Sequence, residues 1–396
     1  MKEGCEYKRL GEVGTFVRGG NFSKKDFVEN GFPCIHYGQI HMKFGVETFK
    51  HLSSVPAEMV KSDRCAKKGD LVIAITSEDD AGSCKCTAWM GDYDAYVGGH
   101  AAIYRHTMQP KYVSYYFMSP YFQKDKLEFT HGFKVVEISP KDIAKIKIPV
   151  PPLSEQQAIV DYLDSAFAKI DAMKANAEKA LNEAKALFQA SLKEMLEPKE
   201  GWEEKKLKKV VVSITDGDHQ PPPKSDDGIP FITISNIEKN SNKIDFGETF
   251  YVPQSYYCAL KKDRIPQKGD VLYTVTGSFG IPVLIDFQKE FCFQRHIALI
   301  RPNMGLLSPT YLFYWILSSY ATSQAEDTAT GAAQRTVSLN SLRNFTIHVP
   351  PLSEQQTIVA TLDTLKSKVD RLQANYNSIS HECDALKQAI LIQVFE

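Results

Sequence analysis

The chain has 396 residues, of which 43% are hydrophobic and 24% charged, and its formal net charge is −1. These values are ordinary for globular domains, and the length is sufficient for two or three domains that each bury a core. The near-neutral charge excludes a strongly basic, stand-alone nucleic-acid binder, and no apolar run approaches the ~18–20 residues that cross a bilayer.

The N-terminal segment, Met-Lys-Glu-Gly-Cys-Glu-Tyr-Lys-Arg, is charged and lacks the apolar core of a secretory signal. The 8 cysteines do not show the regular spacing of a disulfide framework. They are typical of free, buried thiols in a reducing compartment. We therefore expect a soluble cytoplasmic protein without a membrane partner.

Residues 1–150 are expected to form a first globular domain of mixed α and β structure. The short β-branched segment Asp70–Thr76 predicts a strand, and Tyr112–Pro120 predicts a short helix. This part carries 21 Lys and Arg against 18 Asp and Glu. So small an excess supports DNA binding only if the cations cluster on one face, so charge alone leaves nucleic-acid binding undecided.

A long helix is expected over residues 151–198. Pro151 and Pro152 exclude an earlier start, and Ser154 with Gln157 has the spacing of a capping box. Apolar residues then alternate at intervals of three and four, which is typical of a coiled-coil seam. They are Leu163, Ala166, Ile170, Met173, Ala177, Ala180, Ala184 and Leu187.

Residues 199–349 are expected to form a second globular domain, after a linker rich in proline and glycine near residues 197–201. Its β-branched segments Phe231–Ile234, Asp270–Thr276 and Ile297–Ile300 predict strands, and Thr310–Tyr320 predicts a short helix. The composition again indicates mixed α and β structure.

A second long helix is expected over residues 350–396, with Ser353 and Gln356 in the same capping positions. Its seam is Leu362, Leu365, Val369, Leu372, Tyr376, Ile379, Cys383, Leu386 and Ile390, and the first eight lie 199 residues after their counterparts. Two helices packed separately on their own domains would explain single stripes but not matched seams. We therefore expect an antiparallel coiled coil with pseudo-twofold symmetry.

An internal repeat relates the two halves. Residues 148–157, Ile-Pro-Val-Pro-Pro-Leu-Ser-Glu-Gln-Gln, return at 347–356 with a single change. Lys68-Gly69-Asp70-Leu71 likewise returns as Lys268-Gly269-Asp270-Val271. A repeat this long is a whole domain rather than a solenoid unit, whose period is ~20–50 residues. The fold class is therefore α+β, with two mixed globular domains each followed by a long helix.

Catalytic motifs are missing from the sequence. It contains no phosphate loop, no Gly-x-Gly-x-x-Gly, no nucleophile elbow and no Asn/Asp-Pro-Pro-Tyr/Phe peptide of an amino-methyltransferase. Cys84 and Cys86 lack the spacing and the second pair of a zinc site, and Cys34 and His36 fit alternate positions of a strand. Asp216-Gly217-Asp218-His219 could seat a cation but is more typical of a turn.

The two variable domains, each followed by Pro-Pro-Leu-Ser-Glu-Gln-Gln and a long helix, resemble the specificity subunit of a type I restriction–modification system. The resemblance covers the full chain and extends to peptides 31–40, 216–222 and 228–237. It implies two target-recognition domains, at 1–150 and 199–349, that each read one half of a bipartite, asymmetric DNA site. It also implies that helices 151–198 and 350–396 set the gap and dock methyltransferase subunits.

The resemblance implies that the chain is not an enzyme by itself and binds no cofactor. Its partners would be double-stranded DNA, two methyltransferase subunits and restriction/translocase subunits. S-adenosylmethionine, ATP and Mg²⁺ would be used by those partner subunits.

Candidate DNA-binding side chains lie in loops beside the repeated strands, where Gln and Asn can pair with adenine and Arg and Lys with guanine or phosphate. In the first domain they are Lys24, Lys25, His36, Tyr37, Gln39, His41, Lys43, Ser77, Lys85, Phe133 and Lys134. In the second domain they are His219, Gln220, Lys224, Ser235, Asn236, Lys239, Thr276, Ser278, Arg295 and Arg335, with His296 beside them. A structural role for any one of them remains open, and His100 and His296 in particular are interpreted as structural.

Two other functions remain open. One is an assembly scaffold whose globular domains bind protein, which would show no salt-dependent affinity for DNA. The other is a stand-alone nuclease or methyltransferase of an unfamiliar type, which would require activity from the purified chain alone.

Overall fold

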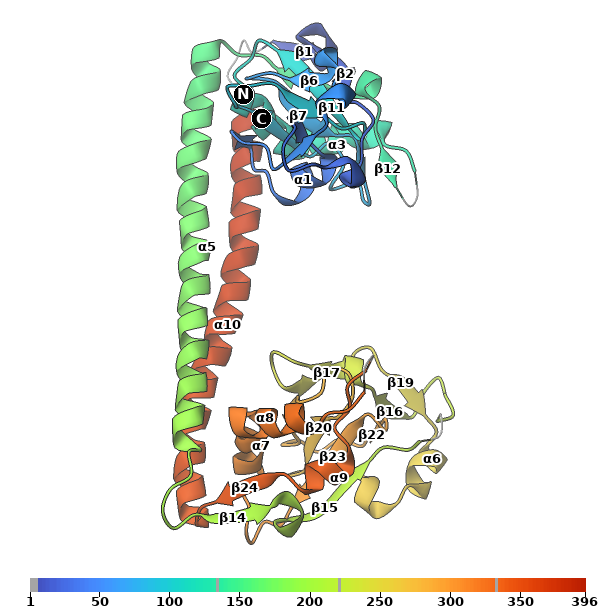
Figure 1. Ribbon diagram of the computed structural model, residues 1–396, viewed down its shortest axis with the longest axis vertical. Coiled ribbons are helices and arrows are strands. Elements are labelled where there is room, and N and C mark those ends of the chain that lie inside the picture. The colour runs from blue at the N-terminus through green and yellow to red at the C-terminus, as the bar shows by residue number, and fades with distance from the viewer. Residues whose placement is uncertain (1–5, 133–134, 220–221, 332–333) are drawn as a thin grey trace. The chain divides into compact units, whose positions relative to one another are not determined.

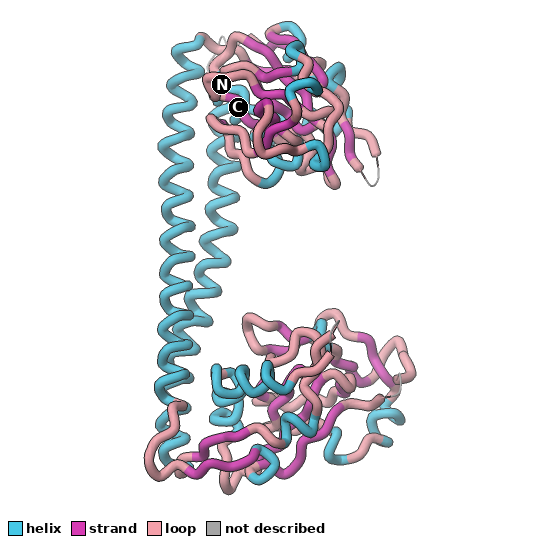
Figure 2. The backbone as a smooth tube through the Cα atoms, viewed as in Figure 1, coloured by secondary structure: helices cyan, strands magenta, loops and turns pink. Residues whose placement is uncertain are grey.

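The computed structural model describes residues 6–132, 135–219, 222–331 and 334–396. The chain divides into two compact units (Figures 1 and 2). Unit 1 comprises residues 1–176 and 378–396, and unit 2 comprises residues 177–377. Each unit therefore holds one globular domain and a part of each long helix, α5 (Leu153–Met195) and α10 (Leu352–Phe395).

Two sheets form the globular domain of unit 1. The larger has the order β2-β11-β7-β9-β4 and the smaller the order β5-β3-β10-β6. Strand β7 reads Leu-Val-Ile-Ala and all four residues are buried, as expected for a strand covered on both faces. The strands are β2 (Gly14–Arg18), β3 (Phe32–Ile35), β4 (Glu47–Thr48), β5 (Ser53–Val55), β6 (Cys65–Ala66), β7 (Leu71–Ala74), β9 (Cys86–Trp89), β10 (Ala95–Val97) and β11 (Ala101–His106).

Helix α2 (Pro110–Met118) packs beside strands β7 and β9 of the larger sheet. The helix begins after Gln109, the N-cap residue, whose side chain accepts a hydrogen bond from the backbone N–H of Tyr112. Proline is tolerated at the first helical position because the backbone N–H that it lacks would have no partner within the helix. Two strand pairs complete the domain, β1 (Tyr7–Arg9) with β13 (Lys147–Pro149) and β8 (Thr76–Ser77) with β12 (Val136–Glu137). The remaining helices are α1 (Tyr37–Met42), α3 (Pro120–Asp125) and α4 (Pro140–Ile143).

Unit 2 repeats this plan. Its sheets have the orders β15-β23-β20-β21 and β19-β16-β22, and the pair β14 with β24 corresponds to β1 with β13. The strands are β14 (Glu203–Lys206), β15 (Val211–Asp216), β16 (Ile229–Ile232), β17 (Ile237–Glu238), β18 (Lys243–Ile244), β19 (Phe250–Val252), β20 (Val271–Thr274), β21 (Pro282–Leu284), β22 (Cys292–Phe293), β23 (Ile297–Pro302) and β24 (Thr346–Val349). The helices are α6 (Gln254–Ala259), α7 (Pro309–Leu317), α8 (Ser319–Thr328) and α9 (Leu339–Arg343). The strands and short helices predicted from the sequence are confirmed in both domains.

The repeated Lys-Gly-Asp peptide forms the same turn before β7 and β20. Gly69 and Gly269 have φ of +94° and +95°, which favours glycine because it has no Cβ. The following aspartate accepts a hydrogen bond from a backbone N–H three residues earlier, at 2.8 Å in both copies. It also faces the arginine near the end of the neighbouring strand, Arg105 in unit 1 and Arg301 in unit 2.

The two long helices are antiparallel within each unit (Figure 1). In unit 1, Lys387 pairs with Asp171 and Lys174 with Asp384, so the numbers rise along α5 as they fall along α10. In unit 2, Lys185 donates to Gln373 at 2.7 Å. No helix in the described residues is long and apolar enough to cross a membrane.

Each domain core contains the end of the other long helix. In unit 1, Phe395 of α10 lies against Tyr112 and Tyr116 of α2, with ring centroids 5.5 and 5.3 Å apart. In unit 2, Phe188 of α5 lies 6.2 Å from Tyr314 of α7. The long helices are therefore part of the cores of both domains rather than appended to them.

Burial along α10 follows the expected seam except at Leu386, whereas on α5 it departs from the seam at several positions. Among the predicted positions on α5, Leu163 and Ile170 are buried and Ala177 is half-buried, whereas Met173 and Leu187 are 58% and 60% exposed. Phe167 and Leu181, which lie between the predicted positions, are buried, as are Phe188 and Leu192 beyond Leu187. On α10, Leu362 and Cys383 are buried, Leu365, Val369, Leu372, Tyr376, Ile379 and Ile390 are half-buried, and Leu386 is 47% exposed. The buried stripe of α5 is displaced because the helix packs against a domain as well as against α10.

Candidate nucleic-acid interface

Four of the candidate side chains make hydrogen bonds within their own domain. His36 precedes α1, its Nδ1 accepts a hydrogen bond from Gly38 N at 3.1 Å, and its own N–H donates to Gln39 Oε1 at 3.0 Å. Unit 2 repeats the second contact, since Thr233 N donates to Asn236 Oδ1 at 2.9 Å. His36 and Asn236 are buried, and His36 lies after strand β3 rather than within it.

The remaining bonds of these side chains are also internal. Gln39 Nε2 donates to Ser53 Oγ, and Asn236 Nδ2 donates to the backbone oxygen of Glu248. Burial, with smaller contributions from Lys24 and His100, lowers the pKa of His36 and keeps the ring neutral. Thr276 is 5% exposed and accepts a bond from Thr336. His36, Gln39, Asn236 and Thr276 therefore make hydrogen bonds within their own domains.

A hollow of about 1060 Å³ in unit 1 brings four other candidates together: Tyr37, His41, Ser77 and Lys85. Lys85 Nζ donates to the backbone oxygen of His41 at 2.7 Å, and His41 Nε2 lies 3.2 Å from the backbone oxygen of Thr76. The Tyr37 ring lies 5.1 Å from that of His100, which is exposed. The rim of the hollow thus offers an ammonium, a phenol and imidazoles.

Acidic residues Glu78 and Asp79 also line this hollow. They would repel a phosphate, so the hollow is better suited to donors and acceptors on base edges than to the DNA backbone. Lys24, Lys25 and Lys43 are exposed and carry the charge that phosphates require. The candidates Phe133 and Lys134 lie outside the described residues.

In unit 2, the candidates that remain exposed are mainly basic. Arg335 lies 5.4 Å from the centre of the Phe279 ring, and its Nη2 donates to the backbone oxygen of Glu326 at 2.6 Å. A guanidinium held in this way is partly ordered before it meets a ligand, which favours planar, bidentate recognition. Lys224 similarly lies 5.0 Å from the centre of the Phe250 ring.

The Asp216–His219 peptide is an ion-paired turn. His219 Nε2 lies 3.0 Å from Asp216, and Arg264 lies within 4 Å of both Asp216 and Asp218. Arg295 is exposed, while burial first, and then Arg295 and His219, lowers the pKa of His296. Ser235, Lys239 and Ser278 are exposed, and Gln220 lies outside the described residues.

The thiols of Cys84 and Cys86 lie in surroundings that disfavour their ionisation. Burial raises the pKa of Cys84 and of Cys86 to about 12, which disfavours the thiolate that binds metals. Among residues 6–132, 135–219, 222–331 and 334–396, no three His, Cys, Asp or Glu side chains are grouped to hold an ion.

Two hydrogen bonds between a domain and the helix that follows it were not predicted from the sequence. Tyr115 donates to Asp164 and Tyr314 to Asp363, each at 2.6 Å. Both residues of each pair are identical at the repeat offset of 199 residues. The identity of both residues at the repeat offset is the signal in the sequence from which these contacts could be predicted.

Comparison with known families gives two matches along the chain. The model described as "Type I restriction modification DNA specificity domain" matches residues 2–183 and 199–381. The chain belongs to this family. Each match contains one globular domain with most of the long helix that follows it.

Relatives with curated names span most of this specificity-domain chain. It is 23% identical to the type I restriction enzyme EcoKI specificity subunit of Escherichia coli K12, covering 100% of this chain and 89% of that protein. It is 22% identical to the StySPI specificity subunit of Salmonella potsdam, with the same coverage. With the EcoBI specificity subunit of Escherichia coli the identity is 24%, over 67% of this chain and 61% of that protein.

Solved structures share the fold. A chain from a structure described as complex assembly and conformational transition of the type I R-M system has a TM-score of 0.78 and 20% identity. It covers 100% of this chain and 98% of its own length. The HsdS subunit of Thermoanaerobacter tengcongensis has a TM-score of 0.58 and 20% identity over 100% of this chain and 97% of that one.

Proposed function

We propose that this chain is the non-catalytic DNA-recognition subunit of a type I restriction–modification complex. The observation that carries the proposal is duplication with divergence. The same sheet-and-helix plan occurs twice and both copies match the specificity-domain family, yet the exposed side chains on the two domains differ. Two unlike domains are suited to two unlike half-sites, whereas identical domains would suit a palindrome.

The reading surfaces proposed here are the hollow lined by Tyr37, His41, Ser77 and Lys85 in unit 1, and the loops bearing Arg295 and Arg335 in unit 2. Exposed lysines, including Lys24 and Lys224, would contact phosphates. Such contacts make affinity fall steeply with salt, since each neutralised phosphate releases a condensed counterion.

The long helices would set the gap between the half-sites and dock two methyltransferase subunits, with restriction/translocase subunits completing the complex in the cytoplasm. S-adenosylmethionine, ATP and Mg²⁺ would be bound by those subunits. Exposed apolar residues on the helices support the docking role, among them Leu153, Tyr162, Met173, Leu187 and Ile392.

The test is to co-express the chain with the methyltransferase of its own system and to map modified adenines on genomic DNA. A split, asymmetric motif with a fixed gap is the expected result. A complex that assembles but leaves adenines unmodified would instead favour the assembly scaffold. Methylation by the purified chain alone would favour the stand-alone enzyme.

A further inference from the structure

A polar connection, joint 1, ties the first domain to α5 through the buried Tyr115 and Gln156 and the partly buried Gln109 and Asp164. Gln156 is 2% exposed. Its Oε1 accepts from the backbone N of Gln109 at 2.9 Å, and its Nε2 donates to the backbone oxygen of Pro151 at 2.8 Å. Because Gln109 is the N-cap residue of α2, this glutamine links the start of a domain helix to the first turn of α5.

Joint 2 repeats the connection in unit 2 through Ser308, Tyr314, Gln355 and Asp363. Gln355 is fully buried, and its Oε1 accepts from the backbone N of Ser308 at 2.8 Å. Its Nε2 donates to the backbone oxygens of Leu306 and Pro350. All three hydrogen bonds are internal to unit 2, as those of joint 1 are to unit 1.

A tyrosine–aspartate bond completes each joint two turns further along the helix. Tyr115 of α2 donates to Asp164 of α5, and Tyr314 of α7 donates to Asp363 of α10. Each joint thus holds two points separated by eight residues on one helix, or about 12 Å at 1.5 Å per residue. Two points fix both the position and the angle of a domain along its helix, which one contact would not.

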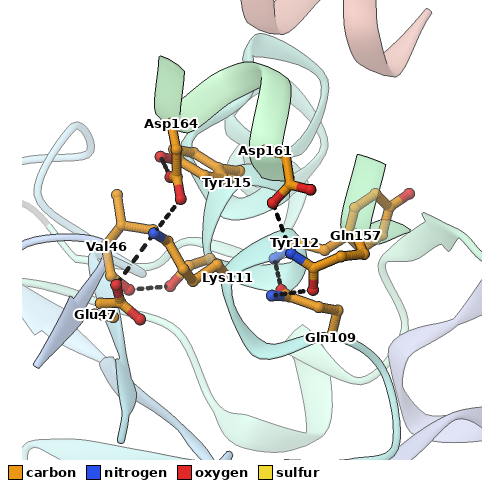
Figure 3. Close-up of polar contacts among 10 residues, drawn as sticks. Val46, Glu47, Gln109, Lys111, Tyr112, Tyr115, Gln157, Asp161 and Asp164 are labelled. Atoms are coloured by element: carbon orange, nitrogen blue, oxygen red, sulfur yellow. Dashed lines mark hydrogen bonds and ion pairs between the residues drawn. The ribbon is translucent and has the colours of Figure 1, made fainter. Parts of the chain in front are cut away.

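The joints differ in charge. In joint 1, Lys111 Nζ lies 2.5 Å from Asp164 and 3.1 Å from Glu47, so an ion pair supports the tyrosine bond (Figure 3). Burial alone would lower the pKa of Lys111, but its bonds to Asp164 and Glu47 outweigh burial and raise it. Thr310 occupies the corresponding position in unit 2 and carries no charge. Joint 1 is therefore reinforced where joint 2 is not.

Apolar burial also connects each domain to its helix, but apolar contacts are not directional. Hydrogen bonds and ion pairs depend on distance and angle, so they resist rotation of one element against another. We infer that Tyr115, Gln156, Asp164 and their counterparts Tyr314, Gln355 and Asp363 are positioning residues for the gap between half-sites. They hold each domain at a fixed angle on its helix, and thereby limit which gap lengths are accepted.

This inference rests on the proposed function. A gap changed by one base pair rotates one half-site by about 35° and moves it by about 3.4 Å. A domain held rigidly would miss a site displaced in this way. A domain with a loosened joint would reach it, without any change in the bases that it reads.

The experiment uses the assembled methyltransferase complex and duplexes with both native half-sites, at the native gap and at gaps one base pair shorter or longer. Methyl transfer from labelled S-adenosylmethionine gives the ratio of altered-gap to native-gap rates. The variants are Y115F, Y314F, K111T and Y115F with K111T. Y121F, which changes a half-buried tyrosine of α3 outside both joints, is the matched control.

For Y314F we expect the ratio to rise about tenfold while the recognised half-sites stay the same. Y115F should raise it less, because Lys111 still holds Asp164, and adding K111T should bring joint 1 to the level of Y314F. Y121F should leave the ratio unchanged.

An unchanged ratio in Y314F, with all rates lowered equally or none lowered, would overturn the inference, since the joint would then serve folding alone. A larger effect in Y115F than in Y314F would overturn the argument from Lys111. If the wild-type complex methylated duplexes with every gap, or needed only one half-site, the proposed bipartite function would be wrong. That result is distinct from an unchanged ratio in Y314F, which would contradict only the role of the joints.

Discussion

The repeated Asp–Arg pair offers a stability test in which the chain supplies its own control. In unit 2, Arg301 Nε and Nη2 donate to the two carboxylate oxygens of Asp270 at 2.9 and 2.7 Å. The Asp270 side chain is 2% exposed and that of Arg301 is 19% exposed. The change D270N keeps the shape of the side chain and removes its charge, so the guanidinium loses its buried counter-ion.

Breaking a buried, bidentate pair from one side costs about 3–5 kcal/mol, and the remaining exposure of Arg301 places this case near 3 kcal/mol. In unit 1 the pair is looser: Arg105 Nε lies 3.6 Å from Asp70, and the two side chains are 32% and 12% exposed. Burial, which outweighs the Lys67 and Arg105 contacts, raises the pKa of Asp70, so the ionised form gains little there. We expect D70N to cost about 1 kcal/mol or less.

Hydrogen exchange measured by mass spectrometry separates the two units. In D270N, peptides covering β20 and β23 should exchange about a hundredfold faster, while those covering β7 and β11 should be unchanged. In D70N, the peptides of β7 and β11 should change by less than about tenfold. Equal effects of the two substitutions, or a larger effect of D70N, would refute the reasoning from geometry and burial.

Three further predictions concern charge, packing and pH. Replacing Lys24 and Lys25 with alanine should reduce the salt slope of DNA affinity by about 2, measured by fluorescence anisotropy, whereas replacing exposed Lys141 of α4 should not. L362D should destabilise unit 2 by more than about 3 kcal/mol in urea unfolding, because Leu362 is fully buried. L386D, at a residue that is 47% exposed, should cost less than about 1 kcal/mol. Similar costs for the two substitutions would contradict the assignment of Leu362 to the buried face of α10. Burial lowers the pKa of His106 from 6.5 to about 4, so the stability that its neutral ring contributes is complete above pH 6.5 and decreases towards pH 4, by about 2 kcal/mol at pH 5. Burial also lowers the pKa of His36 and His296, so H106F should remove about 2 kcal/mol of the decrease at pH 5 and leave the remainder. An unchanged decrease in H106F would exclude His106 as a source.

The local elements could be predicted from the sequence because their signals are local. Strands such as β20 are β-branched runs between glycine or proline, and α2 and α7 begin with a capping residue followed by proline. The position of β11 between β2 and β7 in the sheet cannot be predicted from the sequence of any one of these strands. The strand order depends on contacts between residues far apart in the sequence. The internal repeat indicates that the two domains have such contacts in common, but it does not identify the residues that make them.

The seam of α5 shows where a periodic pattern becomes ambiguous. Intervals of three and four from Leu163 admit either Ala166 or Phe167 as the next position, and both choices include Ile170 and Ala177. Phe167 is buried because its ring meets Tyr115 of α2 edge-on, with centroids 5.5 Å apart. The sequence indicates that a helix has an apolar face, but the position of that face depends on every surface that the helix contacts.

The sequence does not separate structural from recognition roles where both need the same chemistry. An amide that pairs with a base must offer a donor and an acceptor, and so must an amide that caps a backbone turn. Gln39 and Asn236 satisfy the second need, each accepting from a backbone N–H three residues before it. Only burial and partners, which the sequence does not contain, distinguish the two roles.

The duplication itself separates residues that hold the fold from those free to differ. Both joints keep an identical glutamine, tyrosine and aspartate. The glutamine and the tyrosine are buried, which is costly unless their hydrogen-bond partners, the aspartate among them, are in place. Where the copies differ, as at Lys111 and Thr310, the group that changes adds to a contact already made by others. Exposed side chains such as Lys85 and Arg335 have few internal partners to satisfy and can change without loss of the fold. Two domains built in this way can therefore share one attachment to their helices and still bind different sequences.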